Sequence, residues 1–297
     1  MSELKITIGI TAFNCGKYLH DAIRSVFDQN TDHWSGLLIL DGGADKQSKQ
    51  IFQEFDHPKF QKYAFKENQG PYGTRAMAIE LSKTDWYYQL DGDDLLPKNA
   101  IKLILETIET NPHAEFVYGN CEHFSNNSFR IKTPIKDPGA LCVGPLFNAQ
   151  SPIKISLFER IGGFSDELFI NADWDFWLSV YDNNITGAYT DNLLYRRRQR
   201  VNNVGTEYFH LRPKIVEKII QRHPDFFLDD QRKNETRFNC YQKLARYYKS
   251  IGDRKSAAKY AQEALKYGDS IPAFDTIFRE EKMSFLRYKL RRLGRFV

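Results

Sequence analysis

The sequence predicts an α/β protein in which helices flank a mostly parallel β-sheet, followed by an α-helical C-terminal extension. Two observations lead to this fold class. Up to residue 124, strand-like apolar runs alternate with helical segments across short connections, which is the pattern of parallel strands joined by crossover helices. From residue 207 onward the strand signals disappear and helical periodicity remains. We therefore expect one α/β domain over residues 1–205 and a helical extension over residues 206–297.

Five runs rich in β-branched and other apolar residues are the expected strands, at 5–13, 35–43, 60–68, 85–94 and 114–124. Four segments between them are the expected helices, at 14–30, 48–55, 70–83 and 97–112. In the first of these, Leu19, Ile23 and Val26 recur at helical spacing. Residues 235–268 predict a helical hairpin that turns at Gly252 and Asp253, and its small-residue spacing resembles one tetratricopeptide unit.

The composition is that of an ordinary globular chain, since 41% of the 297 residues are apolar and 27% are charged. There is no run of about 18 apolar residues, so no transmembrane helix is expected. The first residues lack the apolar region of a signal peptide, and a cytoplasmic location is therefore expected. The four cysteines are far apart and form no metal-ligand or disulfide spacing, so we expect reduced, structural thiols.

The net charge of +4 is unevenly distributed along the chain. Residues 1–195 hold 17 Lys and Arg against 26 Asp and Glu, a net of −9, whereas residues 196–297 hold 25 against 12, a net of +13. A basic end suits phosphates or an anionic membrane surface, and it equally suits a solvated helical surface. In residues 285–297, apolar residues recur along one helical face among five Lys and Arg. This segment predicts either peripheral membrane contact or a helix that covers its own domain.

The stretch "DWYYQLDGDD" (85–94) ends an apolar strand with three carboxylates, Asp91, Asp93 and Asp94. Three close carboxylates repel one another unless a positive charge compensates them. A hard divalent cation is one solution, because Mg²⁺ and Mn²⁺ are commonly held by one or two carboxylates while substrate phosphates complete the shell. Gly92 would let the chain turn and a ligand approach closely. The alternative is that Asp94 caps the following helix or a turn.

Polar residues also follow other expected strands: Asn14 follows the first strand and Asp41 the second. The carboxyl ends of parallel strands meet at one edge of a sheet, where ligands bind in open α/β folds. Asp41 is therefore interpreted either as a turn-forming residue or as an acceptor for the base or ribose of a nucleotide.

Two further motifs each allow two interpretations. In "NADWDFWLSV" (171–180), Asp173 lies beside large aromatic rings that would desolvate its carboxylate, which suits a general base, or it serves only as a helix N-cap. The stretch "YRRRQR" (195–200) holds four arginines in six residues. It suits either a diphosphate or phosphorylated acceptor, or a solvated strand end.

Taken in order, these pieces resemble an inverting glycosyltransferase of family 2 with the Rossmann-like GT-A fold. The resemblance rests on "ITIGITAFN", "LLILDGGADKQS", "ENQGPYGTRAMAIELSKTDWYYQLDGDDLL" and "FERIGGFSDELFINADWDFWLSV", and it covers roughly residues 4–205. It implies a hexosyl transfer from a nucleotide-sugar donor, with a UDP-sugar favoured, and a divalent cation, Mn²⁺ or Mg²⁺. It also implies a glycan or lipid-linked acceptor in surface polysaccharide or glycoconjugate biosynthesis, and no nucleic acid partner.

The resemblance implies roles for individual residues. Asp93 would ligate the metal directly, while Asp91 would face the ribose or a metal-bound water and contribute to the metal site. Asp173 would deprotonate the acceptor hydroxyl, so that direct displacement inverts the anomeric carbon. The residues implied to line the nucleotide-sugar site are Thr11, Ala12, Phe13, Asn14, Asp41, Asp91 and Gly92.

Several positions depart from the family's pattern. Thr11 stands where the family usually has Pro, Ala172 where it usually has Glu, and Gly42 where many members have a second Asp. Gly73 and Ala76 replace an Asp and an Asn of many relatives. Arg200 lies near the position of a His that some relatives use close to the metal, and an arginine cannot ligate a metal but could contact a diphosphate.

Two alternatives stand beside the glycosyltransferase interpretation. One is a catalytically silent GT-A-like module that binds a nucleotide or a protein, which Ala172 favours and the intact Asp91, Asp93 and Asp173 oppose. The other is a nucleotidyltransferase, for which the single glycine in "TAFNCGKYL" is a poor fit.

Overall fold

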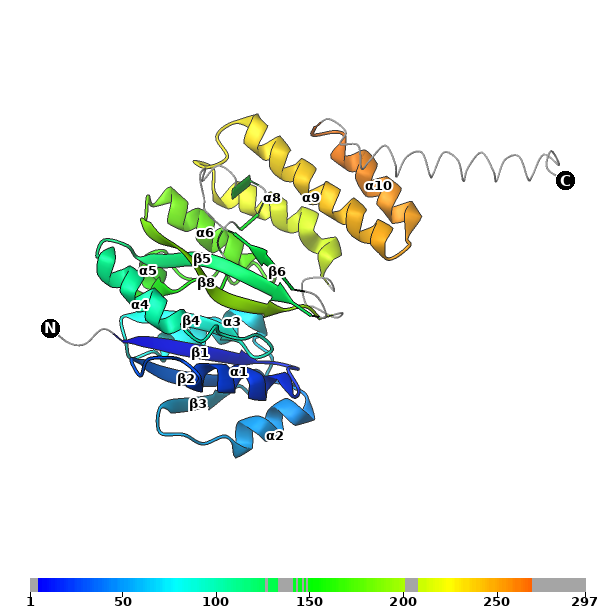
Figure 1. Ribbon diagram of the computed structural model, residues 1–297. Helices are drawn as coiled ribbons and strands as arrows, with labels where there is room; N and C mark the ends of the chain where they lie inside the picture. The colour runs from blue at the N-terminus through cyan, green and yellow to red at the C-terminus, as the bar shows by residue number, and fades with distance from the viewer. Residues whose placement is uncertain are drawn as a thin grey trace, which may run out of the picture. The chain divides into compact units, whose positions relative to one another are not determined.

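The computed structural model describes residues 5–125, 128–132, 141–142, 144–145, 147, 149–200 and 208–268. The chain divides into two compact units, residues 1–138 with 145–201 and residues 139–144 with 202–297 (Figure 1). This division lies close to the domain boundary at 205/206 that the sequence predicts, and that boundary stays a prediction. The amphipathic segment expected at 285–297 lies outside the described residues.

The first unit is built on one eight-stranded sheet with the order β3-β2-β1-β4-β7-β5-β6, in which β8 pairs with β5. The strands are β1 (Ile6–Ala12), β2 (Trp34–Leu40), β3 (Phe60–Ala64), β4 (Trp86–Asp91), β5 (Phe116–Phe124), β6 (Ser128–Ile131), β7 (Ile153–Lys154) and β8 (Gly187–Arg198). Strands β1 to β4 pair in parallel, as do β5 and β8, whereas β6 and β7 run antiparallel to their neighbours. The predicted α/β class with a mostly parallel sheet is confirmed, and each of the five expected strands is present.

Helices flank this sheet on both faces (Figure 1). They are α1 (Tyr18–Phe27), α2 (Lys46–Glu54), α3 (Gly70–Glu80), α4 (Ala100–Thr110), α5 (Ile155–Arg160) and α6 (Ala172–Asp182). Helices α1 and α4 share one apolar core with β1 and β4. Helix α3 packs against β1 and β2, and Trp177 of α6 packs against Phe116 of β5.

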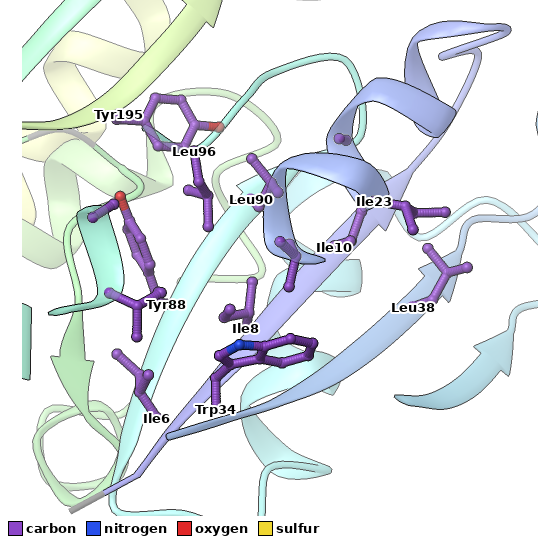
Figure 2. Packing of buried hydrophobic residues seen from close by; sticks show 14 of the residues in the cluster. Ile6, Ile8, Ile10, Ile23, Trp34, Leu38, Tyr88, Leu90, Leu96 and Tyr195 are labelled. Carbon is purple, nitrogen blue, oxygen red and sulfur yellow. The ribbon is translucent and has the colours of Figure 1, made fainter. Parts of the chain in front are cut away.

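Strand β1 has two chemically different faces, because successive side chains of a strand point in opposite directions. Ile6, Ile8 and Ile10 are fully buried in the core that contains α1 (Figure 2). Fully burying an isoleucine side chain contributes about 1.5–3 kcal/mol to stability. On the opposite face, the Thr7 hydroxyl bonds to Thr84, and the Thr11 hydroxyl accepts a bond from Gln89. The sheet therefore has an apolar face for folding and a polar face that bears on the candidate site.

The second unit is helical, with a short 3-10 turn η2 (Phe209–Leu211) and helices α8 (Arg212–Arg222), α9 (Asp230–Ser250) and α10 (Arg254–Ala264). Gly252 has φ 81° between α9 and α10, a conformation that favours glycine. The Asp253 side chain caps α10 by accepting a bond from the Ser256 amide. The two helices pack through small buried residues, Ala245, Ala257, Ala261 and Ala264. The predicted helical hairpin and its turn are confirmed.

Two smaller expectations concern cysteines and membrane spans. The four cysteines are buried and free of disulfides, as their spacing predicts. Among the described residues, no helix combines the length and the apolar character that crossing a bilayer requires.

Gly42, which follows β2, lies against the backbone of Glu67. A Cβ atom at this position would lie 2.2 Å from the carbonyl carbon of Glu67. We expect Gly42→Ala to lower the free energy of unfolding by about 1–3 kcal/mol, because the backbone must shift to relieve this overlap. The measurement is urea denaturation of the two proteins.

The matched control is the next residue, Gly43. It has φ 79° and open space around its Cβ position, so Gly43→Asn should cost no more than about 1 kcal/mol, since asparagine tolerates the left-handed region. Equal stability of Gly42→Ala and Gly43→Asn would contradict the close approach of residues 42 and 67.

Candidate active site

The acidic residues of the fourth strand form a tight turn against the end of β1. The Gly92 amide donates to the Thr11 carbonyl at 2.8 Å. A Cβ atom at Gly92 would lie 2.8 Å from Cys15 Sγ and 3.0 Å from that same carbonyl oxygen. The glycine therefore permits the turn that the sequence predicts, and its predicted contact with a ligand stays a prediction. We call Asp91, Asp93 and Asp94 with Gly92 the acidic turn.

Asp91 is held by side chains on three sides. Arg75 Nη2 donates to both carboxylate oxygens at 2.9 Å. Gln89 Nε2 donates to Oδ1 at 3.0 Å, and Gln150 Nε2 donates to Oδ2 at 2.7 Å. Burial alone would raise the pKa of Asp91, but the charge and hydrogen bonds of Arg75 outweigh it and hold that pKa below its ordinary value. Asp91 is thus a fixed anion whose oxygens are already occupied.

Asp93 has a lighter set of contacts. Arg200 Nη1 donates to Asp93 Oδ2 at 2.9 Å, and Arg200 Nη2 donates to the Asn14 carbonyl at 3.0 Å. Both side chains are partly exposed, 23% for Asp93 and 29% for Arg200. Within the part of the chain that the structure describes, Asp93 Oδ1 accepts no hydrogen bond. Asp93 therefore keeps one oxygen free for a ligand at the carboxyl edge of the sheet.

Asp94 fastens β8 to the acidic turn. Its Oδ2 accepts from the Tyr195 hydroxyl at 2.8 Å, and its Oδ1 accepts from the Arg198 amide at 2.6 Å. Burial, followed by the charges of Asp91 and Asp93, raises the pKa of Asp94 to about 8. The alternative that Asp94 caps the next helix is wrong, because Asn99 occupies the N-cap position of α4.

The arginines of "YRRRQR" pair largely with the chain's own acidic groups. Arg198 donates to the Asp93 carbonyl at 2.8 Å and to the Asp21 carboxylate at 3.1 Å. Arg196 donates to Glu122 at 2.5 Å. This end of β8 is accordingly not a freely solvated strand end, and contact of its arginines with a diphosphate or a phosphorylated acceptor stays a prediction.

The remaining residues predicted to bind a nucleotide lie around the ends of β1 and β2. Asp41 is buried, and its carboxylate accepts from the amides of Gly42, Gln69 and Gly70 at 2.8, 2.7 and 3.1 Å. It therefore orders the start of α3, and direct contact of Asp41 with a nucleotide stays a prediction. Asn14 has φ 50°, and its side chain accepts from the Asp45 amide at 2.8 Å.

The other three residues of the predicted nucleotide site have different exposures. Ala12 is buried, while Phe13 is partly buried and packs on the core. Thr11 Oγ1 accepts from Gln89 Nε2 at 2.8 Å. Because Gln89 also binds Asp91, the threonine at the family's usual proline position indirectly supports the acidic turn. Nucleotide contact by these three residues stays a prediction.

Asp173 lies in the first turn of α6. Its Oδ1 accepts from the Tyr72 hydroxyl at 2.7 Å. Burial, together with the Asp173 charge, raises the pKa of Tyr72 well above its ordinary value, so the tyrosine stays protonated and donates. The N-cap interpretation of Asp173 is wrong, because Asn171 holds the N-cap position with φ 62°.

Helix α3 connects Asp173 to the acidic turn through two residues one turn apart. The Arg75 guanidinium lies 5.5 Å from the centroid of the Tyr72 ring, and Arg75 also binds Asp91. A continuous series of contacts therefore runs from Asp173 through Tyr72 and Arg75 to Asp91. Neither Tyr72 nor Arg75 stands out in the sequence, where α3 carries only a helix pattern. Gln89 carried a signal, because it is a polar residue inside the apolar run "WYYQL".

A small cavity of about 20 Å³ lies beside Asp173. Arg75, Gln89 and Trp177 are among its lining residues. In the described ranges, Arg75 Nε and Trp177 Nε1 are buried N–H groups without a hydrogen-bond partner. The cavity has room for about one water molecule.

A divalent cation fits Asp93 better than Asp91. The described residues contain no group of three or more His, Cys, Asp or Glu that could hold a metal ion. Mg²⁺ and Mn²⁺ need only one or two protein carboxylates when substrate phosphates supply other ligands. Asp93 has a free oxygen for this purpose, whereas Asp91 could bind a cation only by giving up bonds from Arg75, Gln89 or Gln150.

Comparison with known proteins supports the glycosyltransferase family that the sequence resembles. Residues 7–165 match the family model described as Glycosyl transferase family 2. An uncharacterized glycosyltransferase of Haemophilus influenzae is 24% identical over 184 residues, covering 59% of this chain and 61% of the relative. The teichoic acid poly(glycerol phosphate) polymerase of Staphylococcus epidermidis is 32% identical over 105 residues, covering 34% of this chain and 14% of the relative. The chain therefore spans less than two thirds of the length of these relatives.

Solved structures share the fold. Residues 1–349 of TarS from S. aureus, in complex with UDP-GlcNAc, align with a TM-score of 0.64 at 15% identity, covering 88% of this chain and 82% of the other. The mannosyltransferase PcManGT from Pyrobaculum calidifontis, in complex with GDP-Man and Mn²⁺, aligns with a TM-score of 0.57 at 14% identity, covering 99% and 84%. The predicted GT-A-like fold is confirmed.

The Tyr195 hydroxyl should stabilise the fold through the acidic turn. It donates to Asp94 and accepts from the Asp91 amide at 3.1 Å, and the side chain is buried. We expect Tyr195→Phe to lower the free energy of unfolding by about 1–3 kcal/mol, because it leaves buried polar groups without a partner. Urea denaturation at neutral pH measures this change.

Tyr189→Phe is the matched control on the same strand. Its hydroxyl donates to Asp191, which is solvent-accessible, at 3.0 Å and to Asn120 Oδ1 at the longer distance of 3.4 Å. Water replaces that bond, so we expect a change within about 0.5 kcal/mol. If both variants lost a similar free energy of unfolding, the hydrogen bonds of Tyr195 to the acidic turn would not account for the loss in Tyr195→Phe.

Proposed function

The chain belongs to glycosyl transferase family 2, and on this premise we propose that it is a metal-dependent inverting glycosyltransferase. It transfers a sugar from a nucleoside diphosphate donor to a hydroxyl group of an acceptor. One observation carries the proposal: Asp173 and the acidic turn lie in the same compact unit and are joined through Tyr72 and Arg75. These contacts hold Asp173 and the acidic turn in a fixed relative position. Such an arrangement suits a displacement in which a base and the site of the leaving diphosphate act in one step.

Asp173 acts as the general base. Tyr72 holds one carboxylate oxygen, which orients the carboxylate so that the other oxygen takes the proton of the acceptor hydroxyl. The oxygen of that hydroxyl forms the new bond to the anomeric carbon as the bond to the diphosphate breaks. The electron pair of the broken bond leaves with the diphosphate, and attack from the opposite side inverts the anomeric centre.

Asp93 holds the divalent cation, Mn²⁺ or Mg²⁺, which when bound would neutralise the leaving diphosphate. Asp91 stays paired with Arg75 and faces the donor from the end of β4. The two solved neighbours in complex with UDP-GlcNAc and with GDP-Man and Mn²⁺ support a nucleotide-sugar donor. A UDP-sugar is favoured.

The acceptor is a glycan or a lipid-linked glycan of a surface polysaccharide or glycoconjugate. Relatives named as a teichoic acid polymerase and as a chondroitin synthase support this class of product. A cytoplasmic location with peripheral membrane contact through residues 285–297 stays part of the proposal. A catalytically silent module is the second candidate, which the buried Ala172 favours because it takes the place of the family's usual Glu.

The Asp173→Asn substitution tests the base. We expect turnover to fall by roughly 10²–10⁴-fold, because general base catalysis contributes about that much, while donor affinity stays within about twofold. Tyr72→Phe should lower turnover less and leave donor affinity unchanged. Steady-state kinetics with a panel of UDP-sugars and calorimetric titration of UDP separate the two effects.

Asp182→Asn, at the other end of α6, is the matched control and should leave both quantities unchanged. Loss of UDP affinity in Asp173→Asn comparable to the loss of turnover would mean that Asp173 binds the donor and is not the base.

A thermal-unfolding series with nucleotides tests the donor and the cation. We expect UDP with Mn²⁺ at about 100 times its dissociation constant to stabilise the protein by about 2.7 kcal/mol. Adding EDTA should remove most of this stabilisation. Equal stabilisation by UDP in EDTA would refute metal dependence, and no response to any nucleoside diphosphate would favour the silent module.

A further inference from the structure

Arg200 is the residue of the site whose role the proposed reaction leaves open. Its guanidinium pairs with Asp93, the same carboxylate that the proposed function assigns to the divalent metal ion. Arg200 Nη1 binds Asp93 Oδ2 at 2.9 Å, and Nη2 binds the Asn14 carbonyl at 3.0 Å. Because a guanidinium is always protonated, Arg200 has no lone pair for a metal, and its positive charge opposes a cation that binds the other oxygen of Asp93.

The two arginine–aspartate pairs of the acidic turn differ in how firmly they are held. The Arg75 side chain is 10% exposed and binds both oxygens of Asp91, which Gln89 and Gln150 also bind. The two carboxylates are similarly exposed, 26% for Asp91 and 23% for Asp93, so the pairs differ in the burial of the arginine and in the number of bonds. Arg200 touches one oxygen of Asp93, and both side chains reach solvent. A solvent-exposed pair with a single bond contributes little to stability and exchanges readily. The first pair is therefore fixed, and the second is replaceable.

Arg200 lies beside the end of β1, between the Tyr18 ring and Asn14. Its guanidinium carbon lies 5.7 Å from the centroid of the Tyr18 ring, at the start of α1. Asn14, its other partner, follows β1 at the edge where open α/β sheets bind ligands. A guanidinium offers five N–H donors, and its fork matches the oxygens of a phosphate.

We propose that Arg200 is an exchangeable counter-ion of Asp93, which releases Asp93 to a divalent cation and pairs instead with the diphosphate of the donor. This inference rests on the proposed function. Each charge would then keep an opposite partner, because Asp93 would hold the cation and Arg200 would bind the phosphate oxygens. Arg200 opposes binding of the cation alone and favours binding of the diphosphate, so cation and nucleotide assist each other. Such coupling is reciprocal between the two ligands.

The test is calorimetric titration of wild type and Arg200→Gln with MnCl₂ alone, UDP alone, and UDP in the presence of Mn²⁺. In Arg200→Gln we expect Mn²⁺ alone to bind roughly 3- to 10-fold more tightly, because an exposed competing charge is gone. We expect UDP with Mn²⁺ to bind at least about 10-fold more weakly, because a charge-assisted hydrogen bond is lost. The two effects have opposite signs, which a merely unfolded or loosened site would not produce.

Two variants control for charge and for folding. Arg196→Gln removes one charge from the same stretch, where Arg196 pairs with Glu122 and not with Asp93, and it should leave both affinities within about twofold. Arg200→Lys keeps the charge but loses the fork. It should bind Mn²⁺ alone like wild type and bind UDP with an affinity between wild type and Arg200→Gln, and it replaces Arg200→Gln if that variant does not fold.

Unchanged or weaker Mn²⁺ binding in Arg200→Gln would overturn the competition for Asp93. Unchanged UDP affinity would overturn the diphosphate contact. Either result, with wild type still binding UDP, refutes this inference and leaves the proposed function standing. Failure of wild type to bind any nucleoside diphosphate would instead refute the proposed function.

Discussion

Compensation of three adjacent carboxylates by the chain's own donors is the constraint on which the site and much of the fold depend. Asp91 is neutralised by Arg75 of α3, and Asp93 by Arg200, which follows β8. Asp94 takes its bonds from Tyr195 and from the Arg198 amide of β8. Because these partners come from α3 and from residues 195–200, the acidic turn draws α3 and β8 to the end of β4. The need of these carboxylates for partners thus connects segments that are distant in the sequence.

Hydrogen bonds on the polar face of the sheet connect the acidic turn to residues of β1 and β4. On β4, Tyr87 donates to Gln89, and Gln89 donates to Asp91 and to the hydroxyl of Thr11 on β1. A proline at position 11 would offer no hydroxyl, so the departure from the family's usual residue has a physical reason in this chain. The apolar face, with Ile8 and its neighbours, supplies burial free energy and leaves the polar face available for chemistry.

The order of strands and helices could be predicted from the sequence because hydrophobic periodicity and turn residues are local signals. The rim position of Asp91 and Asp93 followed from strand ends alone. The partners of these residues could not be predicted, because Tyr72 and Asp173 are 101 residues apart and Arg200 and Asp93 are 107 residues apart. Repulsion in "DGDD" correctly indicated a nearby positive charge, but it could not say whether a metal or an arginine supplies it. Strand β7 has only two residues, too few for any periodic signal.

The different burial of Arg75 and Arg200 then assigns different tasks to two similar ion pairs. Desolvation makes removal of a partner from a buried pair costly, so Arg75 cannot leave Asp91 without stranding a charge. An incoming cation therefore meets least resistance at Asp93, where solvent screens the pair and one oxygen is free. Arg200 therefore carries the adaptable charge of the acidic turn. Arg75 carries the immobile charge, on the side of Tyr72 and Asp173, and this suits the fixed geometry that the proposed base requires.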